Sequence, residues 1–253
     1  MRQFSAVGMQ TEDDAERMSR LGFDPRRISI TGSLKHASRE AEDGNGQRAK
    51  RADLPIARKE AREILVVGST HRGEEEILLD VFLFLKTRFP TFLMVLAPRH
   101  PQRFYEVERL LQKRNVRYEK QSQMNGREDS LADVILLDTL GDLPAFYSVA
   151  DIAFIGGSLV DAGGHNLLEP ARFGKPVLFG PYMTNFADIA EEMRRKGGGV
   201  EVHGREDLIR EISELLADPK RAERMGKLAY SVAEGDRGVM ERSIGLVSRY
   251  LHP

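Results

Sequence analysis

Five short runs of apolar residues recur from residue 64 onward, and their spacing constrains the fold more than any other feature. They cover residues 64–67, 92–96, 134–137, 152–155 and 177–179, and a further short strand is expected at 200–202. Continuous apolar runs of this length are typical of parallel strands that are covered on both faces. Helix-forming segments separate them, at residues 74–88, 101–114, 143–149, 167–173 and 186–195. This alternation predicts an α/β fold with a Rossmann-like, doubly wound parallel sheet.

The first 35 residues predict less structure. Short strands are expected at 6–9 and 28–32, and a helix is expected between about residues 12 and 21. Thr11 would cap that helix, and the acidic residues after it favour the helix dipole. Pieces of this size bury little surface by themselves. We therefore interpret residues 1–35 as a remnant of an N-terminal domain.

The rest of the chain divides into two predicted parts. Residues 36–62 are polar and contain Gly and Pro, which predicts a linker. Residues 63–253 are predicted to form the Rossmann-like domain. Helices at about 206–217, 220–233 and 238–251 would end it, the last of them packing back toward an absent domain. That surface would be apolar in the isolated chain, which predicts a homodimer or a pairing with an N-terminal half.

The composition excludes several kinds of protein. Cysteine is absent, which excludes disulfides, a thiolate nucleophile and a zinc site built from cysteine. The formal net charge is -1, so no overall field favours nucleic acid. No apolar run approaches the ~20 residues that span a bilayer, and the first residues lack the pattern of a signal peptide. We expect a chain that by itself is cytoplasmic and has no nucleic-acid partner.

Glycine and polar residues gather at four predicted strand ends. These segments are 68–73, 98–101, 138–141, and 156–158 together with 163–166. In open α/β sheets, ligands bind beyond the carboxyl ends of the strands, and all four segments would lie along that edge. We therefore expect one shared pocket there.

The glycines at 156–157 and 163–164 favour a phosphate site. Glycine lets the backbone approach a ligand, and N–H groups at a helix start favour an anion. The alternative is that these glycines only form tight turns. The Gly-Lys-Ser/Thr element of a P-loop is absent, and no Gly-x-Gly-x-x-Gly follows the first strand.

Other candidate residues keep two interpretations each. Glu169 lies in the first turn of a predicted helix, where its carboxylate could accept from ribose hydroxyls or simply complement the helix dipole. Arg99 could bind a phosphate or a sugar carboxylate, or it could be an ordinary surface arginine. His71, His100 and His165 follow three different strands without the local spacing of a metal site. We expect neither a metal nor another cofactor.

Together the motifs resemble the C-terminal part of 3-deoxy-D-manno-octulosonate (Kdo) transferases of lipid A assembly. The most specific run is Gly163-Gly164-His165-Asn166-x-x-Glu169-Pro170-Ala171, and further motifs support it. These are Gly68-Ser69-Thr70-His71 with Gly73-Glu74-Glu75, Ala97-Pro98-Arg99-His100-Pro101, Asp138-Thr139-Leu140-Gly141-Asp142-Leu143, and Gly156-Gly157-Ser158-Leu159-Val160. The resemblance covers about residues 5–195. Ser33 and Asp142 stand where the family usually has Asn and often has Glu.

The resemblance implies the C-terminal domain of a GT-B glycosyltransferase, which binds the CMP part of the donor CMP-Kdo. Glu169 would hold the ribose, and Asn166 would orient the nucleotide. The phosphate would contact Gly157, Ser158 and the Gly163-Gly164 turn, while Arg99 would border the cytosine or the Kdo carboxylate. The residues implied to bind the donor are Ser69, His71, Arg99, Gly141, Gly157, Ser158, Gly164, His165, Asn166 and Glu169.

The resemblance also implies what the chain lacks. In the family, the N-terminal domain carries the catalytic base, binds the acceptor lipid IVA and contacts the cytoplasmic side of the inner membrane. The sequence therefore predicts a chain that binds CMP but does not transfer Kdo by itself, and its catalytic residue is unassigned. The alternatives are another GT-B nucleotide-sugar transferase or epimerase, and a non-catalytic nucleotide-binding module.

Overall fold

The computed structural model describes residues 4–10, 12–32, 63–124 and 132–251. The chain forms two compact units. The larger unit extends from Gly46 to Val232, and the smaller unit combines Met1–Asn45 with Ala233–Pro253. The predicted linker at 36–62, the predicted cap Thr11 and the family departure Ser33 lie outside the described residues.

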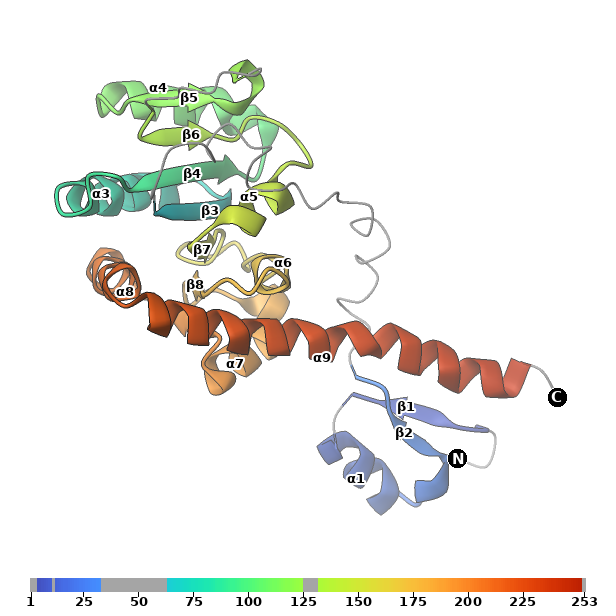
Figure 1. Ribbon diagram of the computed structural model, residues 1–253. Helices are drawn as coiled ribbons and strands as arrows, with labels where there is room; N and C mark the ends of the chain where they lie inside the picture. The colour runs from blue at the N-terminus through green and yellow to red at the C-terminus, as the bar shows by residue number, and fades with distance from the viewer. Residues whose placement is uncertain (1–3, 11, 33–62, 125–131, 252–253) are drawn as a thin grey trace. The chain divides into compact units, whose positions relative to one another are not determined.

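The larger unit contains a seven-stranded parallel sheet in the order β5-β6-β4-β3-β7-β8-β9 (Figure 1). Its strands are β3 (Ile64–Thr70), β4 (Leu93–Pro98), β5 (Tyr118–Lys120), β6 (Val134–Leu136), β7 (Ile152–Ile155), β8 (Val177–Phe179) and β9 (Gly199–Glu201). The central strands are buried on both faces, as their apolar sequences require. The predicted doubly wound parallel sheet is confirmed.

The edge strand β5 is the strand that the sequence did not predict. Its residues Tyr118, Glu119 and Lys120 are only partly buried and do not form an apolar run. The strand exists because Tyr118 and Lys120 pair in register with Val134 and Leu136 of β6. Backbone pairing with a buried neighbour therefore defines this strand, whereas a local apolar pattern does not.

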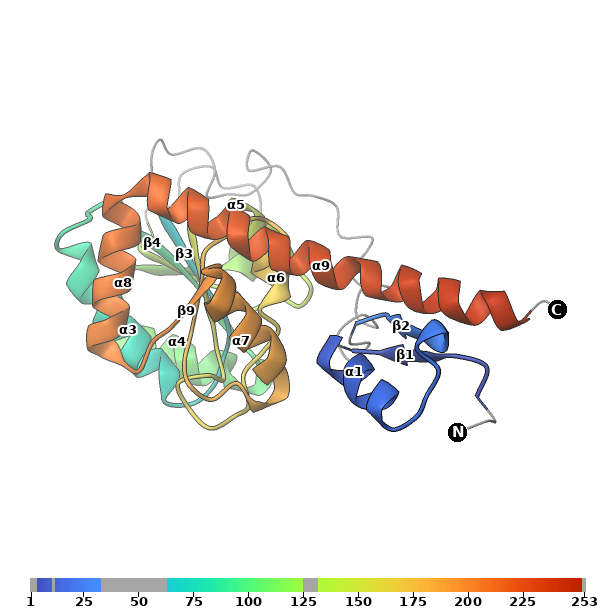
Figure 2. The same ribbon diagram turned by 90° about the horizontal axis from the view of Figure 1, so that it is seen from below.

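Helices cover both faces of the sheet (Figure 2). They are α3 (Glu74–Lys86), α4 (Phe104–Lys113), α5 (Leu143–Val149), α6 (Leu168–Ala171), α7 (Ala187–Lys196) and α8 (Arg205–Ala217), with single turns η4 (Pro101–Arg103), η5 (Gln121–Gln123) and η6 (Thr184–Phe186). Helices α3, α4 and α8 lie on one face, and α5 and α6 lie on the other. The helix predicted at 167–173 is shorter in the structure, where it ends at Ala171, although Arg172 keeps helical backbone angles.

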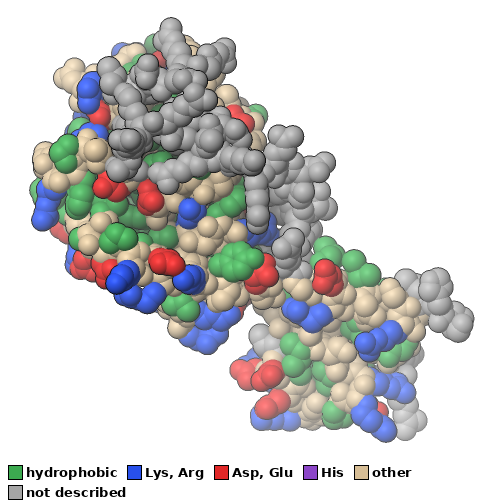
Figure 3. Space-filling view, viewed as in Figure 1, with side chains coloured by type: hydrophobic (Ala, Val, Ile, Leu, Met, Phe, Trp, Pro, Cys, Tyr) green, Lys and Arg blue, Asp and Glu red, His purple; other side chains and the backbone are tan. Residues whose placement is uncertain are grey.

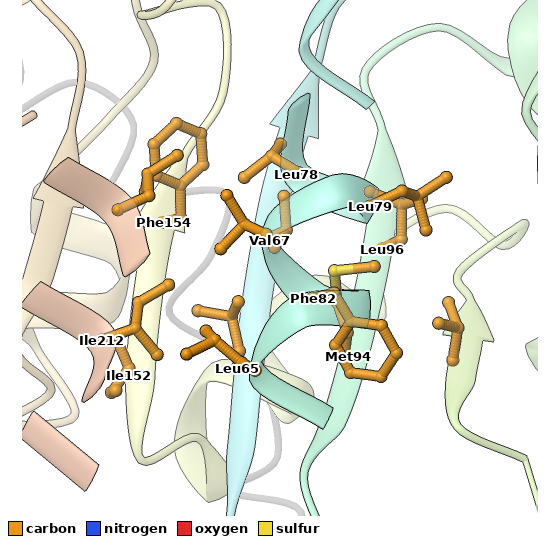
Figure 4. Close-up of a cluster of buried hydrophobic side chains, with 14 of the residues drawn as sticks. Leu65, Val67, Leu78, Leu79, Phe82, Met94, Leu96, Ile152, Phe154 and Ile212 are labelled. Atoms are coloured by element: carbon orange, nitrogen blue, oxygen red, sulfur yellow. The ribbon is translucent and has the colours of Figure 1, made fainter. Parts of the chain in front are cut away.

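The core of the larger unit lies between the sheet and the α3 and α8 helices (Figure 4). Side chains from β3, β4 and β7 interdigitate with those of the two helices. The labelled members are Leu65, Val67, Leu78, Leu79, Phe82, Met94, Leu96, Ile152, Phe154 and Ile212. On the outer surface, acidic and basic side chains lie next to one another over this unit (Figure 3), in keeping with the net charge of -1.

The smaller unit contains β1 (Val7–Met9), α1 (Glu12–Arg20), the turn η1 (Pro25–Arg27) and β2 (Ile28–Ile30), with β1 and β2 paired in parallel. The C-terminal part of α9 (Pro219–Leu251) packs in the same unit. The Nε of Arg242 in α9 donates to the carbonyl of Thr31 at 3.2 Å. The helices predicted at 220–233 and 238–251 are one continuous helix, since the glycines between them do not interrupt it.

The close approach of β3 and the end of β7 depends on Gly156. Its N–H donates to the carbonyl of Gly68 at 2.7 Å, and a Cβ at this position would overlap the backbone of Ser69 and Thr70. The side chain of alanine therefore has no space unless the two chain segments separate.

We expect Gly156→Ala to lower the free energy of unfolding by about 1–3 kcal/mol, the usual cost of overpacking. Gly235→Ala is the matched control, because Gly235 lies in α9 and its Cβ would meet nothing within 4 Å. That control should gain about 0.5–1 kcal/mol, since alanine favours a helix over glycine. Urea denaturation of both variants tests the expectation, and equal stabilities would contradict it.

Candidate functional site

Strand β3 lies at the point where the order of the sheet reverses. It pairs with β4 on one side and with β7 on the other, and the chain reaches β4 directly but β7 only after β6. Ligands of doubly wound sheets bind at the carboxyl ends of the strands that flank such a point. The segments after β3 and β7 are therefore the centre of the candidate site.

Two histidines from these segments face each other. The Nε2 atoms of His71 and His165 lie 2.9 Å apart, and their rings stack with centroids 5.1 Å apart. His100, which follows β4, meets the ring of His71 edge-on at 5.4 Å between centroids. A hydrogen bond between two imidazole nitrogens requires that one donate and the other accept. The pair therefore loses this bond when both Nε2 atoms carry protons.

Burial and the charges around it both disfavour the protonated form of His71. Burial lowers the pKa of the His71 imidazole, and the nearby charges of His100, Arg103 and Arg99 lower it further, while Glu75 opposes them. In its neutral form, the Nε2 of His71 can either accept a hydrogen bond from the Nε2 of His165 or donate one to it. The site thus combines a His71 imidazole whose neutral form is favoured with positive charge around it, which suits an anionic ligand.

Glu74, the first residue of α3, joins the segments after β3 and β7. It is fully buried, and its Oε2 accepts from the N–H groups of His71 at 2.8 Å and Gly157 at 2.6 Å. Its Oε1 accepts from Ser158 at 3.0 Å and Leu159 at 2.9 Å. Burial raises the pKa of the Glu74 carboxyl, although these four donors counter part of that effect.

This arrangement gives Gly157 and Ser158 partners within the protein, while their predicted contact with a phosphate stays a prediction. Their N–H groups were expected to bind a phosphate, but they already donate to Glu74. The Ser158 hydroxyl is also engaged, since it donates to the carbonyl of Ile155 and accepts from the N–H of Gly180. The segment after β7 does form an anion-binding turn, and a side chain of the protein occupies it.

A second buried acid, Glu75, binds Arg103. Two guanidinium nitrogens of Arg103 lie 2.5 and 3.1 Å from the Glu75 carboxylate, which also accepts from the hydroxyl of Thr70 at 2.8 Å. This pair lies beside His71 and contributes to its electrostatics. Glu74 and Glu75 belong to the motif Gly73-Glu74-Glu75, for which no role was predicted from the sequence. Two consecutive acids at a helix start after a buried strand were the available signal.

The remaining predicted residues of the segments after β3 and β4 have distinct surroundings. Ser69 adopts a positive φ of 58°, which is unusual for a residue with a side chain and typical of strained functional turns. Arg99 is exposed, and its N–H donates to the carbonyl of Thr70 at 3.0 Å. Its side chain therefore lies exposed at the rim of the site.

The segment before α6 is held by its own side chains and backbone. The N–H of Gly164 donates to the carbonyl of Gly157 at 2.8 Å, and the Oδ1 of the buried Asn166 accepts from the N–H of Leu168 at 3.0 Å. Asn166 thereby stabilises the start of α6 with its oxygen. Glu169 follows in that helix and is partly exposed.

Glu169 lies close to a buried tyrosine from α5. Burial raises the pKa of the Tyr147 phenol far above its usual range, and the charge of Glu169 raises it further. The Tyr147 hydroxyl packs directly against Gly68 of β3. Tyr147 therefore links the end of β3 to the helix that carries Glu169, a role that the sequence analysis did not predict.

Among the described contacts, none joins Gly141 to the residues that follow β3 and β7. It is exposed in the segment after β6, with open space where a Cβ would stand. Nearby, Asp138 accepts from the N–H of Ser122 at 2.9 Å and from its hydroxyl at 2.6 Å. Asp138 thus connects the ends of β5 and β6.

Two further properties concern the described residues. No group of three His, Asp or Glu side chains among them is arranged to hold a metal ion. None of the described helices combines the length and the apolar character needed to cross a bilayer.

The sequence matches the family described as "Glycosyl transferases group 1" over residues 107–232. It is 35% identical to a 3-deoxy-D-manno-octulosonic acid transferase of Haemophilus influenzae over 251 residues, which are 98% of this chain and 58% of that relative. The chain thus spans little more than half the length of this relative. It is also similar to a bifunctional glycosyltransferase/methyltransferase of Fusobacterium nucleatum, with 38% identity over 82% of this chain and 32% of that protein.

A solved structure is similar to this chain. It is the C-terminal CMP-Kdo binding domain of WaaA from Acinetobacter baumannii, with a TM-score of 0.64 and 29% identity over 68% of this chain and 90% of that one. These findings confirm the predicted fold, a Rossmann-like C-terminal domain of the GT-B type. They also confirm the family resemblance inferred from the motifs.

The His71 environment predicts how stability depends on pH. Since the pKa of His71 is lowered in the folded protein, its contribution to stability is complete above the unfolded pKa of about 6.5 and is lost as pH falls through the folded pKa. We expect the wild type to lose more unfolding free energy between pH 8 and 5 than His71→Gln does. Urea denaturation across this range measures the difference. His203→Gln is the control, because His203 is exposed, and it should follow the wild type.

Proposed function

The chain belongs to the 3-deoxy-D-manno-octulosonic acid (Kdo) transferase family and matches its C-terminal part. We therefore propose that it binds the donor CMP-Kdo. In a complete enzyme it would serve the transfer of Kdo to the lipid A precursor lipid IVA in lipopolysaccharide biosynthesis, at the cytoplasmic side of the inner membrane. The observation that carries the proposal is the similarity to a CMP-Kdo binding domain over 90% of that domain.

The geometry of the site supports a place for the phosphate of the donor. His71 and His165 lie at the switch point of the sheet with their Nε2 atoms hydrogen-bonded to each other, and Arg99 and Arg103 add positive charge near His71. The N–H groups of Gly157 and Ser158 already donate to Glu74. We therefore place the phosphate at the imidazole pair and the Gly163-Gly164 turn. Positive charge fixed in advance near this position would stabilise the charge that develops on CMP as it leaves.

The other parts of the donor have candidate partners around that position. Glu169 would accept from the ribose hydroxyls, since it lies at the start of α6 near Tyr147. His165 and Asn166 precede it and would orient the nucleotide. Arg99, exposed at the rim, would border the cytosine or the Kdo carboxylate, which a guanidinium can bind in a bidentate way.

Nucleotide selectivity tests this proposal. Calorimetric titration of the chain with CMP, UDP and GDP should give the strongest binding for CMP. Several structures with the same fold bind UDP or UDP-sugars, among them the UDP-GlcNAc 2-epimerase of Neisseria meningitidis, with a TM-score of 0.58 and 17% identity. A preference for UDP would therefore replace the Kdo assignment by another GT-B activity. A chain that binds none of the three nucleotides would be a non-catalytic module.

We expect Glu169→Ala to weaken CMP binding by roughly ten- to a hundredfold. The reason is the loss of charge-assisted hydrogen bonds to the ribose, which are worth ~1.5–3 kcal/mol. Calorimetry with 2′,3′-dideoxy-CMP is the control, because this ligand lacks the hydroxyls that Glu169 would hold. The substitution should change its affinity much less. An equal loss for both ligands would show that Glu169 acts through the fold and not on the ribose.

We further propose that the chain does not transfer Kdo by itself. General-base catalysis typically contributes ~10²–10⁴-fold, and positioning of the acceptor contributes more. The family motifs identified in this chain belong to the donor side. The purified chain, incubated with CMP-Kdo and lipid IVA, should yield no glycolipid product by mass spectrometry. Robust turnover would contradict the proposal and would assign a base within this chain, with His71 and the exposed Asp161 as the residues to substitute first.

A further inference from the structure

The carboxylate of Glu74 occupies a set of N–H groups that a phosphate could otherwise use. Three of its donors, Gly157, Ser158 and Leu159, are consecutive residues after β7, and the fourth, His71, follows β3. Each carboxylate oxygen accepts from two of them. The side chain is fully buried, so water does not replace any of these bonds. Such a carboxylate resembles an anion bound in a turn of backbone donors.

The hydrogen bonds of Glu74 position the backbone that carries the imidazoles of His71 and His165. The N–H of His71 donates directly to Glu74, so that bond positions the backbone that carries one ring. Gly157 donates to Glu74 and accepts from the N–H of Gly164, the residue before His165. The Cβ that Gly157 lacks would lie against the rings of both His165 and His71. Glu74 is therefore connected to both members of the pair through two short paths.

A carboxylate is the side chain that satisfies these four donors. The amide of glutamine has the same shape but presents an NH₂ group in place of one oxygen. In either orientation of that amide, two backbone N–H groups would face another donor and lose their partner. Burial makes such unsatisfied donors costly. The negative charge and the shape of Glu74 are thus both required by its surroundings.

We propose that Glu74 is a positioning residue, which holds the His71–His165 pair for the phosphate of the donor by occupying the N–H groups of Gly157, Ser158 and Leu159. This inference rests on the proposed function for the identity of the ligand. Since the internal carboxylate fills the turn after β7, the phosphate is directed to the imidazoles. The role of the turn is then to orient the histidines and not to bind the ligand.

Removal of the Glu74 side chain should create a binding site for a small anion. Glu74→Ala leaves four N–H donors around a space of the size of a carboxylate, and formate can fill it. We expect formate to raise the melting temperature of Glu74→Ala in a saturable way and to have no comparable effect on the wild type. Glu76→Ala is the matched control, since Glu76 lies in the same first turn but is exposed. Potassium chloride at equal ionic strength separates formate binding from salt effects.

Histidine NMR and calorimetry then test the positioning role. In Glu74→Gln and Glu74→Ala, the Cε1–H resonances of His71 and His165 should move, their titration midpoints should shift, and CMP affinity should fall about tenfold or more. Formate should restore the resonances and the affinity of Glu74→Ala, whereas Glu76→Ala should match the wild type throughout. Glu74→Gln keeps the size of the side chain, so it supplies the same readouts if Glu74→Ala does not fold.

The outcomes separate this inference from the proposed function. Unchanged histidine titrations in Glu74→Gln, or a formate effect equal in the wild type and Glu74→Ala, would overturn the positioning role whatever the chain binds. Rescue of the melting temperature and histidine resonances by formate, in a chain that does not bind CMP, would support the positioning of the pair and overturn the donor assignment. Intact CMP affinity in both Glu74 variants would overturn the role toward the phosphate.

Discussion

The parallel pairing of β3 with β4 on one side and with β7 on the other is the constraint on which the larger unit depends. A strand with partners on both sides must be apolar on both faces, and β3 is buried over nearly its whole length. Because the chain leaves β3 toward β4 and returns to it at β7, the segments after β3 and β7 both lie at the switch point of the carboxyl edge. Gly156 permits the two segments to approach closely there, since a side chain at that position would overlap Ser69.

The two acids at the start of α3 convert this geometry into a defined site. Glu74 connects the ends of β3 and β7 through four N–H groups, and Glu75 binds Arg103 beside them. Burying two adjacent carboxylates would be costly without partners, and here each has several. Both carboxylates are thereby paired in the interior, and the charges of Arg103 and Arg99 act on His71 beside them. This polarity suits a ligand that carries a phosphate and a carboxylate.

The two units of the chain differ in how much they bury. The larger unit has a core from two helices and the sheet, whereas β1, β2 and α1 bury little and α1 contributes no fully buried residue. In α9, Ile244, Val247 and Tyr250 are each more than half exposed. These apolar side chains are exposed at the surface of one helix. The division at residues 35 and 62 and the pairing with a second copy or an N-terminal half remain predictions.

The sequence by itself determined the type and order of the elements from residue 64 onward, because burial on both faces imposes continuous apolar runs that are visible locally. It also determined which segments lie at the carboxyl edge, and the ordered motifs indicated the family. It did not predict β5, the continuity of α9 or the role of Tyr147, because these depend on neighbours distant in the sequence. The tertiary structure alone decided that the N–H groups of Gly157 and Ser158 belong to Glu74. Those residues are 83 and 84 positions apart from it, and only the pairing of β3 with β7 brings the carboxylate within reach.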